Sequence, residues 1–226
     1  MARVVDGLTE QQNGAGRLVA VVVTYNRLAQ LQVTLPRLLE SQPEHLQAVI
    51  VVDNASTDGT GHWLGEQSDP RLEVLRCSEN LGGAGGFEAG MRMAVEQFDP
   101  DWLLVMDDDA RPESAALELF HAQNRDHAEA WAAAVYHPDG RICDMNRPSV
   151  NPFWNLAVLR RTVTGGGRNG FHIGAAEYAA SETTSIDGAS FVGLFISRAA
   201  IARVGFPDGR LFIYGDDVLY TLGLRQ

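Results

Sequence analysis

Apolar runs alternate with amphipathic stretches through the first two-thirds of the chain. Four short apolar runs lie at residues 18–24, 48–52, 72–75 and 102–106. Each is followed by polar residues and then by apolar positions spaced three or four residues apart. This alternation is typical of strand–helix–strand units, so it predicts an α/β fold in which helices flank a mostly parallel central sheet.

The helical spacing predicts a helix after each of these runs. The helices are expected around Leu28 to Leu39, through Trp63 and Leu64, from Phe87 to Phe98, and from Pro112 through Phe120. Proline suits the first turn of a helix, because an N–H would have no partner there. We therefore expect the last of these helices to begin at Pro112.

Beyond residue 120 the pattern is less regular. Residues 130–136 and 190–197 are predicted to be strands, 198–204 a short helix, 206–214 loop and strand, and a last helix is expected to begin near Asp216. The sequence shows no internal repeat and no sign of a second domain.

Two segments lack a clear period. Residues 142–185 predict a long functional loop region or a small subdomain, and the Gly-x-Gly-x-x-Gly at 165–170 follows no convincing strand, so it is expected to be a flexible loop. Residues 1–16 contain no apolar run and are expected to form a flexible arm. The remainder, residues 17–226, fits a single domain.

The charge of the chain excludes several chemistries. All 18 basic side chains are Arg, there is no Lys, and 29 acidic residues give a formal net charge of −11. A chain without Lys has no phosphate-loop lysine, no Schiff base and no Ser-x-x-Lys nucleophile. The acidity also disfavours a nucleic-acid surface, because phosphate neutralisation needs a basic stripe.

Cysteine content and hydropathy bear on the cellular compartment. The chain has two cysteines, no secretory signal, and no apolar stretch of the roughly 18 residues that span a bilayer. We therefore expect a reduced, cytoplasmic protein, with at most a peripheral contact at the inner face of a membrane. The net acidity predicts poor binding to lipid headgroups.

Polar residues follow one predicted strand after another. The clusters are Thr24 to Arg27, Asp53 with Asn54, Asn80 with the glycines after it, and Asp107 to Asp109. Ligands of open α/β sheets bind beyond the carboxyl ends of the strands. We therefore expect these clusters to converge on one edge of the sheet and to form the functional site there.

Three adjacent carboxylates, Asp107 to Asp109, follow the fourth apolar run. Like charges at the end of a buried strand repel one another, and a bound cation would offset the repulsion. Hard oxygen ligands favour Mg²⁺ or Mn²⁺, and the first and third carboxylates can both reach one ion. An acidic turn that caps the following helix explains these residues equally well.

The other candidate residues also have structural alternatives. Asp53 could accept hydrogen bonds from a ribose or a base, whereas Asp58 fits the N-cap of a helix. Four glycines in residues 82–86 would let backbone N–H groups approach a ligand. Asp216 and Asp217 could cap the last helix, or one of them could serve as a general base.

Together these segments resemble glycosyltransferase family 2. The order and spacing match the nucleotide-sugar-binding half of the GT-A fold in Val21 to Arg27, Val51 to Thr60, Asn80 to Gly86 and Asp107 to Asp109. Gly82 to Phe87 and Phe212 to Asp217 resemble more narrowly the galactofuranosyltransferase and rhamnosyltransferase branch. The resemblance covers residues 17–226 and is most specific before residue 112.

The resemblance implies a role for each matching residue. Asp107 and Asp109 would hold Mn²⁺ or Mg²⁺, and Asp217, with Asp216 beside it, would be the general base of an inverting transfer. Residues 17–112 would be the nucleotide-sugar-binding half of the domain and residues 113–226 the acceptor-side half. The donor-binding residues would be Thr24, Tyr25, Asn26, Arg27, Asp53, Asn54, Asn80, Gly82, Gly83 and Asp108.

The substrates implied are a UDP- or dTDP-linked donor of galactofuranose or rhamnose and a glycan or lipid-linked glycan acceptor of a bacterial cell surface. Related enzymes usually supply a further metal-ligating His and acceptor-binding or membrane-contacting helices beyond the segment where this chain ends. The acceptor-side half is therefore expected to be truncated, and a nucleotide-sugar-binding fragment without catalysis is one alternative. A nucleotidyltransferase is another, disfavoured because its activating Lys and Arg-rich phosphate loop are absent.

Overall fold

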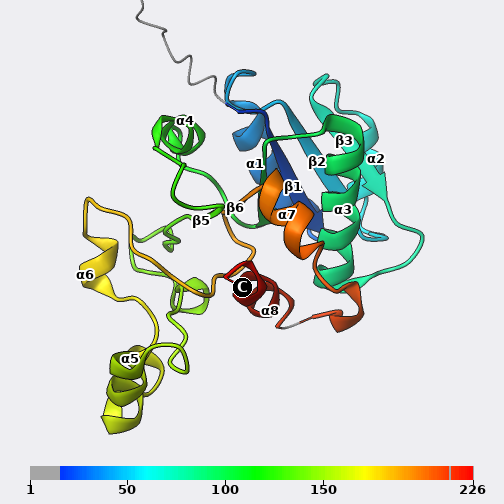
Figure 1. Ribbon diagram of the computed structural model, residues 1–226. Coiled ribbons are helices and arrows are strands. Elements are labelled where there is room, and N and C mark those ends of the chain that lie inside the picture. The colour runs from blue at the N-terminus through cyan, green and yellow to red at the C-terminus, as the bar shows by residue number, and fades with distance from the viewer. Residues whose placement is uncertain (1–15, 214, 226) are drawn as a thin grey trace, which may run out of the picture.

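The computed structural model describes residues 16–213 and 215–225. The expected arm, residues 1–16, lies outside the described residues except for Gly16, and Tyr214 also lies outside them. Figure 1 shows a central sheet with helices on both faces and an extension of short helices on one side. None of the described helices is long and apolar enough to cross a bilayer.

The central sheet has six strands in the order β3-β2-β1-β4-β6-β5. The strands are β1 (Leu18–Thr24), β2 (Ala48–Asp53), β3 (Leu72–Arg76), β4 (Trp102–Asp107), β5 (Ala130–Ala132) and β6 (Leu194–Ser197). The pairs among β1 to β4 are parallel, whereas β6 pairs antiparallel with both β4 and β5. The predicted α/β class with a mostly parallel sheet is confirmed.

Helices cover the two faces of the sheet and form two separate cores with it. They are α1 (Leu28–Leu39), α2 (Thr60–Gly65), α3 (Gly82–Phe98), α4 (Ala116–Ala122), α7 (Arg198–Val204) and α8 (Asp216–Leu224). Val21 of β1 packs in one core with Phe87 of α3, and Val22 packs in the other with Leu31 of α1. Because successive side chains of a strand point to opposite faces, one apolar run supplies both cores.

Glycines let α3 approach the sheet closely. A Cβ atom at Gly90 would lie 2.5 Å from Cγ1 of Val21 and 2.7 Å from Cγ2 of Val52, both buried. We expect Gly90→Ala to lower the free energy of unfolding by about 1–3 kcal/mol through overpacking, and Tm by about 2–4 °C for each kcal/mol. Thermal melts of Gly65→Ala provide the control, since a Cβ there would meet nothing within 4 Å. Equal melting temperatures for the two variants would contradict this packing.

Several expected boundaries are wrong. α3 begins at Gly82, so the glycine run forms the first turns of a helix that packs directly on the sheet, rather than a loop before it. α4 begins at Ala116, because a turn closed by its N–H and the carbonyl of Glu113 separates it from Pro112. β6 begins only after Gly193, whose φ of 73° interrupts an extended backbone, and β5 ends at Ala132.

Residues 206–213 contain a short 3₁₀ helix, η4 (Gly209–Leu211), and no strand. Asp208 caps η4 by accepting a hydrogen bond from the N–H of Arg210 at 3.1 Å. Phe212, which follows η4, has a φ of 59°, in the left-handed region that an extended strand cannot include. The strand expected among these residues is therefore wrong.

Residues 142–185 form a small subdomain, one of the two expected alternatives. Its elements are η1 (Asp144–Asn146), α5 (Leu156–Arg161), η2 (Thr162–Gly166), η3 (Gly167–Gly170) and α6 (Ala175–Tyr178). The glycine motif at 165–170 lies in η2 and η3, where Nε of Arg161 donates to the carbonyl of Gly170 at 2.7 Å. The motif thus forms short helical turns, and the flexibility expected from the sequence stays a prediction.

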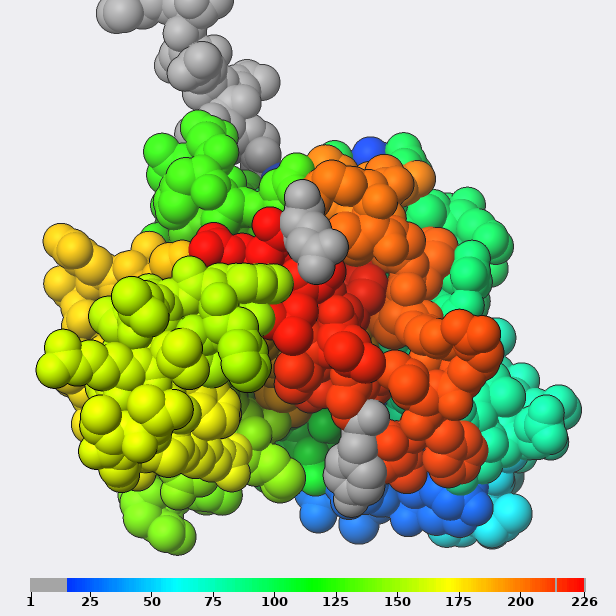
Figure 2. Space-filling model, turned by 60° about the horizontal axis from the view of Figure 1, so that its bottom comes forward, coloured from blue at the N-terminus to red at the C-terminus, as the bar shows by residue number. Residues whose placement is uncertain are grey.

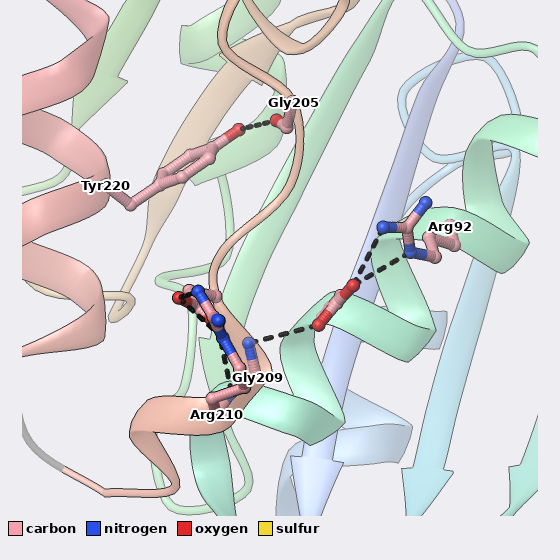
Figure 3. A network of polar contacts seen from close by, with 7 residues as sticks. Arg92, Gly205, Gly209, Arg210 and Tyr220 are labelled. Carbon is pink, nitrogen blue, oxygen red and sulfur yellow. Dashed lines mark hydrogen bonds and ion pairs between the residues drawn. The ribbon is translucent and has the colours of Figure 1, made fainter.

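Polar contacts join η4 and α8 to the rest of the domain (Figure 3). Glu88 of α3 accepts hydrogen bonds from the guanidinium of Arg92 at 2.8 Å and from the N–H of Gly209 at 3.0 Å. The hydroxyl of Tyr220 in α8 donates to the carbonyl of Gly205 at 3.0 Å. These contacts hold the segment between α7 and α8 and so determine where the first turn of α8 lies.

Candidate functional site

Four neighbouring strands end in polar residues at the same edge of the sheet. The register pairs Thr24 with Asp53 and Asp53 with Arg76, while Asp107 pairs with Val23. The structure therefore brings the expected strand-end residues together. Arg76 is not among the residues expected from the sequence, although it ends β3 as Asp53 ends β2. Applying the strand-end rule to β3 as well would find it.

Asp108 is held inside the protein by two threonines. Its carboxylate accepts a hydrogen bond from Oγ1 of Thr24 at 2.7 Å, and its carbonyl accepts one from Oγ1 of Thr34 at 2.6 Å. Asp108 is buried, and the burial raises the pKa of its carboxyl. Asp108, the middle residue of the acidic segment, is thus held against β1 and α1, and this fixes the backbone between Asp107 and Asp109.

The two flanking carboxylates, Asp107 and Asp109, differ in their surroundings. NH1 of Arg27 lies 2.6 Å from Oδ2 of Asp109, and this pair is about half exposed. No donor among the described residues hydrogen-bonds the carboxylate of Asp107. Both residues therefore have oxygen atoms that could bind a ligand, provided that Arg27 shares Asp109.

The acidic segment carries more negative charge than its surroundings offset. Burial and the neighbouring charges of Asp109 and Asp108 raise the pKa of Asp107 to about 7, against the opposing effect of Arg27. The charge of Asp217 raises this pKa further, which indicates that the first turn of α8 lies near the end of β4. A cation at this position would relieve the repulsion.

Asp216 and Asp217 begin α8 directly after its N-cap, Gly215. Burial raises the pKa of both carboxyls. Asp216 is buried, whereas Asp217 is partly exposed and accepts a hydrogen bond from the N–H of Val218 at 2.7 Å. The N-cap itself is a glycine, so Asp216 and Asp217 interact with the helix start from its first turn, and Asp217 is the more accessible proton acceptor.

Asn54 holds the second cluster together. Its Nδ2 donates to Oδ1 of Asn80 at 3.0 Å and to the carbonyl of Gly82 at 2.8 Å. Oδ1 of Asn26 accepts a hydrogen bond from the N–H of Thr57 at 2.7 Å. The side chains of these three asparagines, which are expected to contact the donor, therefore make contacts within the protein and shape the edge.

Asp53 has an unused hydrogen-bonding oxygen. The residue is fully buried; its Oδ1 accepts from the N–H of Ser56 at 2.8 Å, and its Oδ2 has no hydrogen-bond partner among the described residues. Nε of Arg76 lies 3.6 Å from Oδ2, and its side chain is 62% exposed. Asp58, by contrast, accepts hydrogen bonds from the N–H groups of Thr60 at 3.1 Å and Leu28 at 2.9 Å, but the N-cap of α2 is Gly59, so the N-cap role expected for Asp58 is wrong. Asp53 can therefore accept one further hydrogen bond through its Oδ2 atom.

Tyr25, Gly82 and Gly83 complete the expected set. Tyr25 is exposed, and Gly83 is partly exposed. Gly82 is buried with a φ of 71°, and a Cβ there would lie 2.2 Å from the carbonyl oxygen of Phe212. Gly82 therefore serves the packing of α3 against η4, and Gly83 is the glycine that a ligand can reach.

The metal expected from the sequence has no complete site of protein ligands here. Within residues 16–213 and 215–225, no group of three His, Cys, Asp or Glu side chains is arranged to hold an ion. Magnesium-type sites, however, often use one or two carboxylates and leave the other positions to phosphate and water. Asp107 and Asp109 fit such a site, because burial and then the charge of Asp109 raise the pKa of Asp107, and a cation would offset both effects.

Solved structures with this arrangement of sheet and helices are GT-A glycosyltransferases. S. aureus TarS aligns with a TM-score of 0.61 and 19% identity, over 92% of this chain and 55% of the other. Mannosyltransferase PcManGT from Pyrobaculum calidifontis aligns with a TM-score of 0.55 and 20% identity, over 89% of this chain and 50% of the other. The GT-A class expected from the sequence is confirmed.

The family follows from the sequence itself. A family model described as glycosyl transferase family 2 matches residues 19–174, and the chain belongs to this family. The match includes the ends of β1, β2, β3 and β4, which carry the residues of the edge site.

Curated relatives include two proteins named galactofuranosyltransferase GlfT1. The one from Mycolicibacterium smegmatis is 30% identical over 204 residues, 88% of this chain and 62% of the relative. The one from Mycobacterium tuberculosis is 33% identical over 208 residues, 88% of this chain and 61% of the relative. An undecaprenyl-phosphate mannosyltransferase from Micrococcus luteus is 39% identical over 95 residues, 41% of this chain and 38% of the relative. The chain thus spans less than two thirds of the length of these relatives.

Proposed function

We propose that the protein transfers a sugar from a nucleoside-diphosphate donor to a glycan acceptor in one inverting displacement. The observation that carries this proposal is the grouping of Asp107, Asp109 and Asp217, in which the charges of the other two act on Asp107. Membership of glycosyltransferase family 2 supports it and favours sugar transfer over nucleotidyl transfer.

The edge of the sheet would bind the donor. Asp107 and Asp109 would hold Mn²⁺ or Mg²⁺, which when bound neutralises the charge that develops on the leaving diphosphate. Arg27, already paired with Asp109, would supply a second positive charge. The unused oxygen of Asp53 would accept a hydrogen bond from a ribose hydroxyl or a base N–H, with Arg76 beside it. An acidic chain without Lys can therefore bind an anionic donor.

The other residues expected to bind the donor divide into two groups, according to whether a ligand can reach them or whether they contact other parts of the protein. Tyr25 and Gly83 are accessible and would contact the donor directly. The remaining residues would hold the shape of the donor site through their contacts with one another and with nearby backbone: Thr24, Asn26, Asn54, Asn80, Gly82 and Asp108.

Asp217 would act as the general base. It accepts the proton of the acceptor hydroxyl while the oxygen forms a bond to the anomeric carbon. The bond between that carbon and the donor phosphate oxygen breaks at the same time, and its electron pair leaves with the nucleoside diphosphate. Burial, and to a smaller extent the charge of Asp216, raise the pKa of Asp217, which makes Asp217 a better base near neutral pH. Attack opposite the leaving group inverts the configuration.

The names of the relatives favour particular substrates. Two of them are galactofuranosyltransferases, which favours galactofuranose over rhamnose as the sugar. UDP and UDP-GlcNAc are bound in structures of TarS, and GDP-mannose with Mn²⁺ in PcManGT, so a UDP-linked donor is the first candidate. The name of the Micrococcus luteus relative includes a lipid phosphate, which supports a lipid-linked glycan as the proposed acceptor.

A panel of nucleotide sugars, read by thermal shift with and without Mn²⁺, tests this proposal. We expect UDP-galactofuranose to raise Tm more than GDP-mannose, and more with Mn²⁺ than without; a ligand at 100 times its Kd stabilises by about 2.7 kcal/mol. Binding without turnover for any acceptor would indicate a nucleotide-sugar-binding protein. Pyrophosphate release from nucleoside triphosphates would indicate a nucleotidyltransferase, and no shift with any nucleotide sugar would contradict the donor site.

A further inference from the structure

One part of the subdomain differs from the rest of the chain in charge. Residues 145–176, here called the basic segment, contain four arginines and no Asp or Glu, although the whole chain has a net charge of −11. Asp144 precedes the basic segment and pairs with Arg147, and Glu177 follows it and accepts a hydrogen bond from the N–H of Gly174. The other arginines of the basic segment, Arg160, Arg161 and Arg168, form no ion pair with a described residue.

The basic segment also exposes large apolar side chains. Phe153 is 85% exposed, Leu156 81% and Val163 72%, and Trp154 and Met145 are exposed as well. Single exposed apolar residues are ordinary on a protein surface, but a group of them marks an interaction site. Here the group coincides with the acid-free part of an acidic protein.

Apolar and basic side chains alternate on one side of α5 and η2. Leu156, Arg160 and Val163 are four and three residues apart, which places them on the same side, whereas Val158 is buried on the other. An open hollow of about 510 Å³ lies between Leu156, Ala157, Arg160, Arg161 and Thr164. It offers an apolar wall together with two guanidinium groups, the combination that accepts a phosphate attached to an acyl chain.

The basic segment is held in a defined shape. Oδ1 of Asn155 caps α5 by accepting from the N–H groups of Ala157 and Val158, both at 3.1 Å. Nε of Arg161 donates to the carbonyl of Gly170 at 2.7 Å, and Nε of Arg147 to the carbonyl of Ile173 at 2.8 Å. The apolar side chains are therefore presented to solvent by an ordered scaffold.

The basic segment lies at the same end of the molecule as α8. In Figure 1, α5 projects from the lower end, and Figure 2, which brings that end forward, shows residues 150–170 in yellow-green beside the red helix α8. A flat surface could approach both from this side.

We propose that the basic segment docks the protein on the surface of an anionic phospholipid bilayer. Phe153, Trp154 and Leu156 enter the headgroup region, where aromatic and aliphatic side chains are favoured, and the arginines contact lipid phosphates. Charge complementarity favours an anionic bilayer as the partner, because each Arg of the basic segment that lies near the membrane surface adds to the attraction. The proposal goes beyond sugar transfer, since the basic segment shares no residue with the edge site.

Flotation with vesicles tests the docking. We expect the protein to bind vesicles of phosphatidylglycerol and phosphatidylcholine about tenfold or more tightly than vesicles of phosphatidylcholine alone, and to lose this binding as salt is added. Arg160→Glu and the double variant Phe153→Ser with Leu156→Ser should each weaken it by about tenfold or more. Arg111→Glu and Leu119→Ser are the matched controls, because both residues are exposed outside the basic segment, and should bind as the parent does.

Tryptophan fluorescence gives a second measurement. Anionic vesicles should shift the emission to shorter wavelength and protect it from acrylamide, and Trp154→Phe should remove this change, while thermal melts show that each variant is folded. Equal binding to both kinds of vesicle, or parent-like binding by the variants of the basic segment, would overturn the proposal. A second outcome would also overturn it: the parent does not bind vesicles and sediments as a dimer, and the double variant of Phe153 and Leu156 sediments as a monomer. A second copy of the chain would then be the partner of the basic segment.

Discussion

Asp217→Asn is expected to reduce the rate of sugar transfer by about 10²–10⁴-fold while nucleotide-sugar binding is retained. The substitution keeps the size of the side chain but removes its ability to accept a proton. Burial raises the pKa of Asp217, so the parent rate should rise with pH as this carboxyl ionises and the variant should lose that dependence. Steady-state kinetics across pH, with donor binding measured by calorimetry, separate the two effects.

Two comparisons make this test specific. Asp126→Asn removes the same charge at an exposed residue that is not part of the edge site, and this variant should transfer at the parent rate. Asp217→Glu keeps a carboxylate and should recover part of the loss. Transfer by Asp217→Asn at the parent rate would mean that another group is the base.

Asp107→Asn is expected to abolish the effect of Mn²⁺ on donor binding and, without metal, to raise thermal stability at alkaline pH. Burial and like charges raise the pKa of Asp107 to about 7, above its ordinary 3.8. The folded state therefore binds this proton more tightly than the unfolded state, so the parent loses stability as pH rises from about 4 to about 7. The advantage of the variant should grow across that window and level off above it.

Thermal melts between pH 4 and pH 9, with and without Mn²⁺, measure both parts of this prediction. Mn²⁺ should stabilise the parent mainly above pH 7, where it no longer competes with a proton, and should leave Asp107→Asn unchanged. Asp126→Asn again serves as the control for loss of one negative charge. If Mn²⁺ stabilises the variant as much as the parent, Asp107 is not a metal ligand.

The parallel half of the fold could be predicted because its signal is local. The runs at 18–24, 48–52, 72–75 and 102–106 correspond to β1 to β4 within a residue or two. β1 and β2 are buried on both faces, and such strands need nearly continuous apolar sequence. The strand-end rule then locates Thr24, Asp53 and Asp107 without knowledge of any contact.

The remaining features depend on contacts between distant segments. The start of α3 at Gly82 depends on the carbonyl of Phe212, which occupies the space where a Cβ would lie. The sequence does not tell whether the amide of Asn54 contacts a sugar donor or another part of the protein. Its hydrogen bonds to Asn80 and Gly82, seen only in the structure, show that it contacts the protein. Roles that rest on such contacts cannot be read from spacing.

The net charge of the chain and the charge of one segment lead to different predictions for lipid binding, and both stay predictions. The acidity of the whole chain predicts poor lipid binding, but the average conceals residues 145–176, where only positive charges occur. Because screening limits electrostatic attraction to about 8–10 Å, a surface responds to the charges of the face that approaches it rather than to the total. A count of charge along the chain would detect this segment.

The antiparallel pairing of β6 with β4 has a consequence for how such proteins diversify. After Asp107 the chain adds only the short edge strand β5, and at Leu194 it returns as β6 directly beside β4. Lengthening a loop whose ends are already adjacent costs only a logarithmic increase in closure entropy. Residues 108–193 can therefore change in length at little cost in closure entropy while the parallel strands keep their register and the ends of β1, β2 and β4 stay in place.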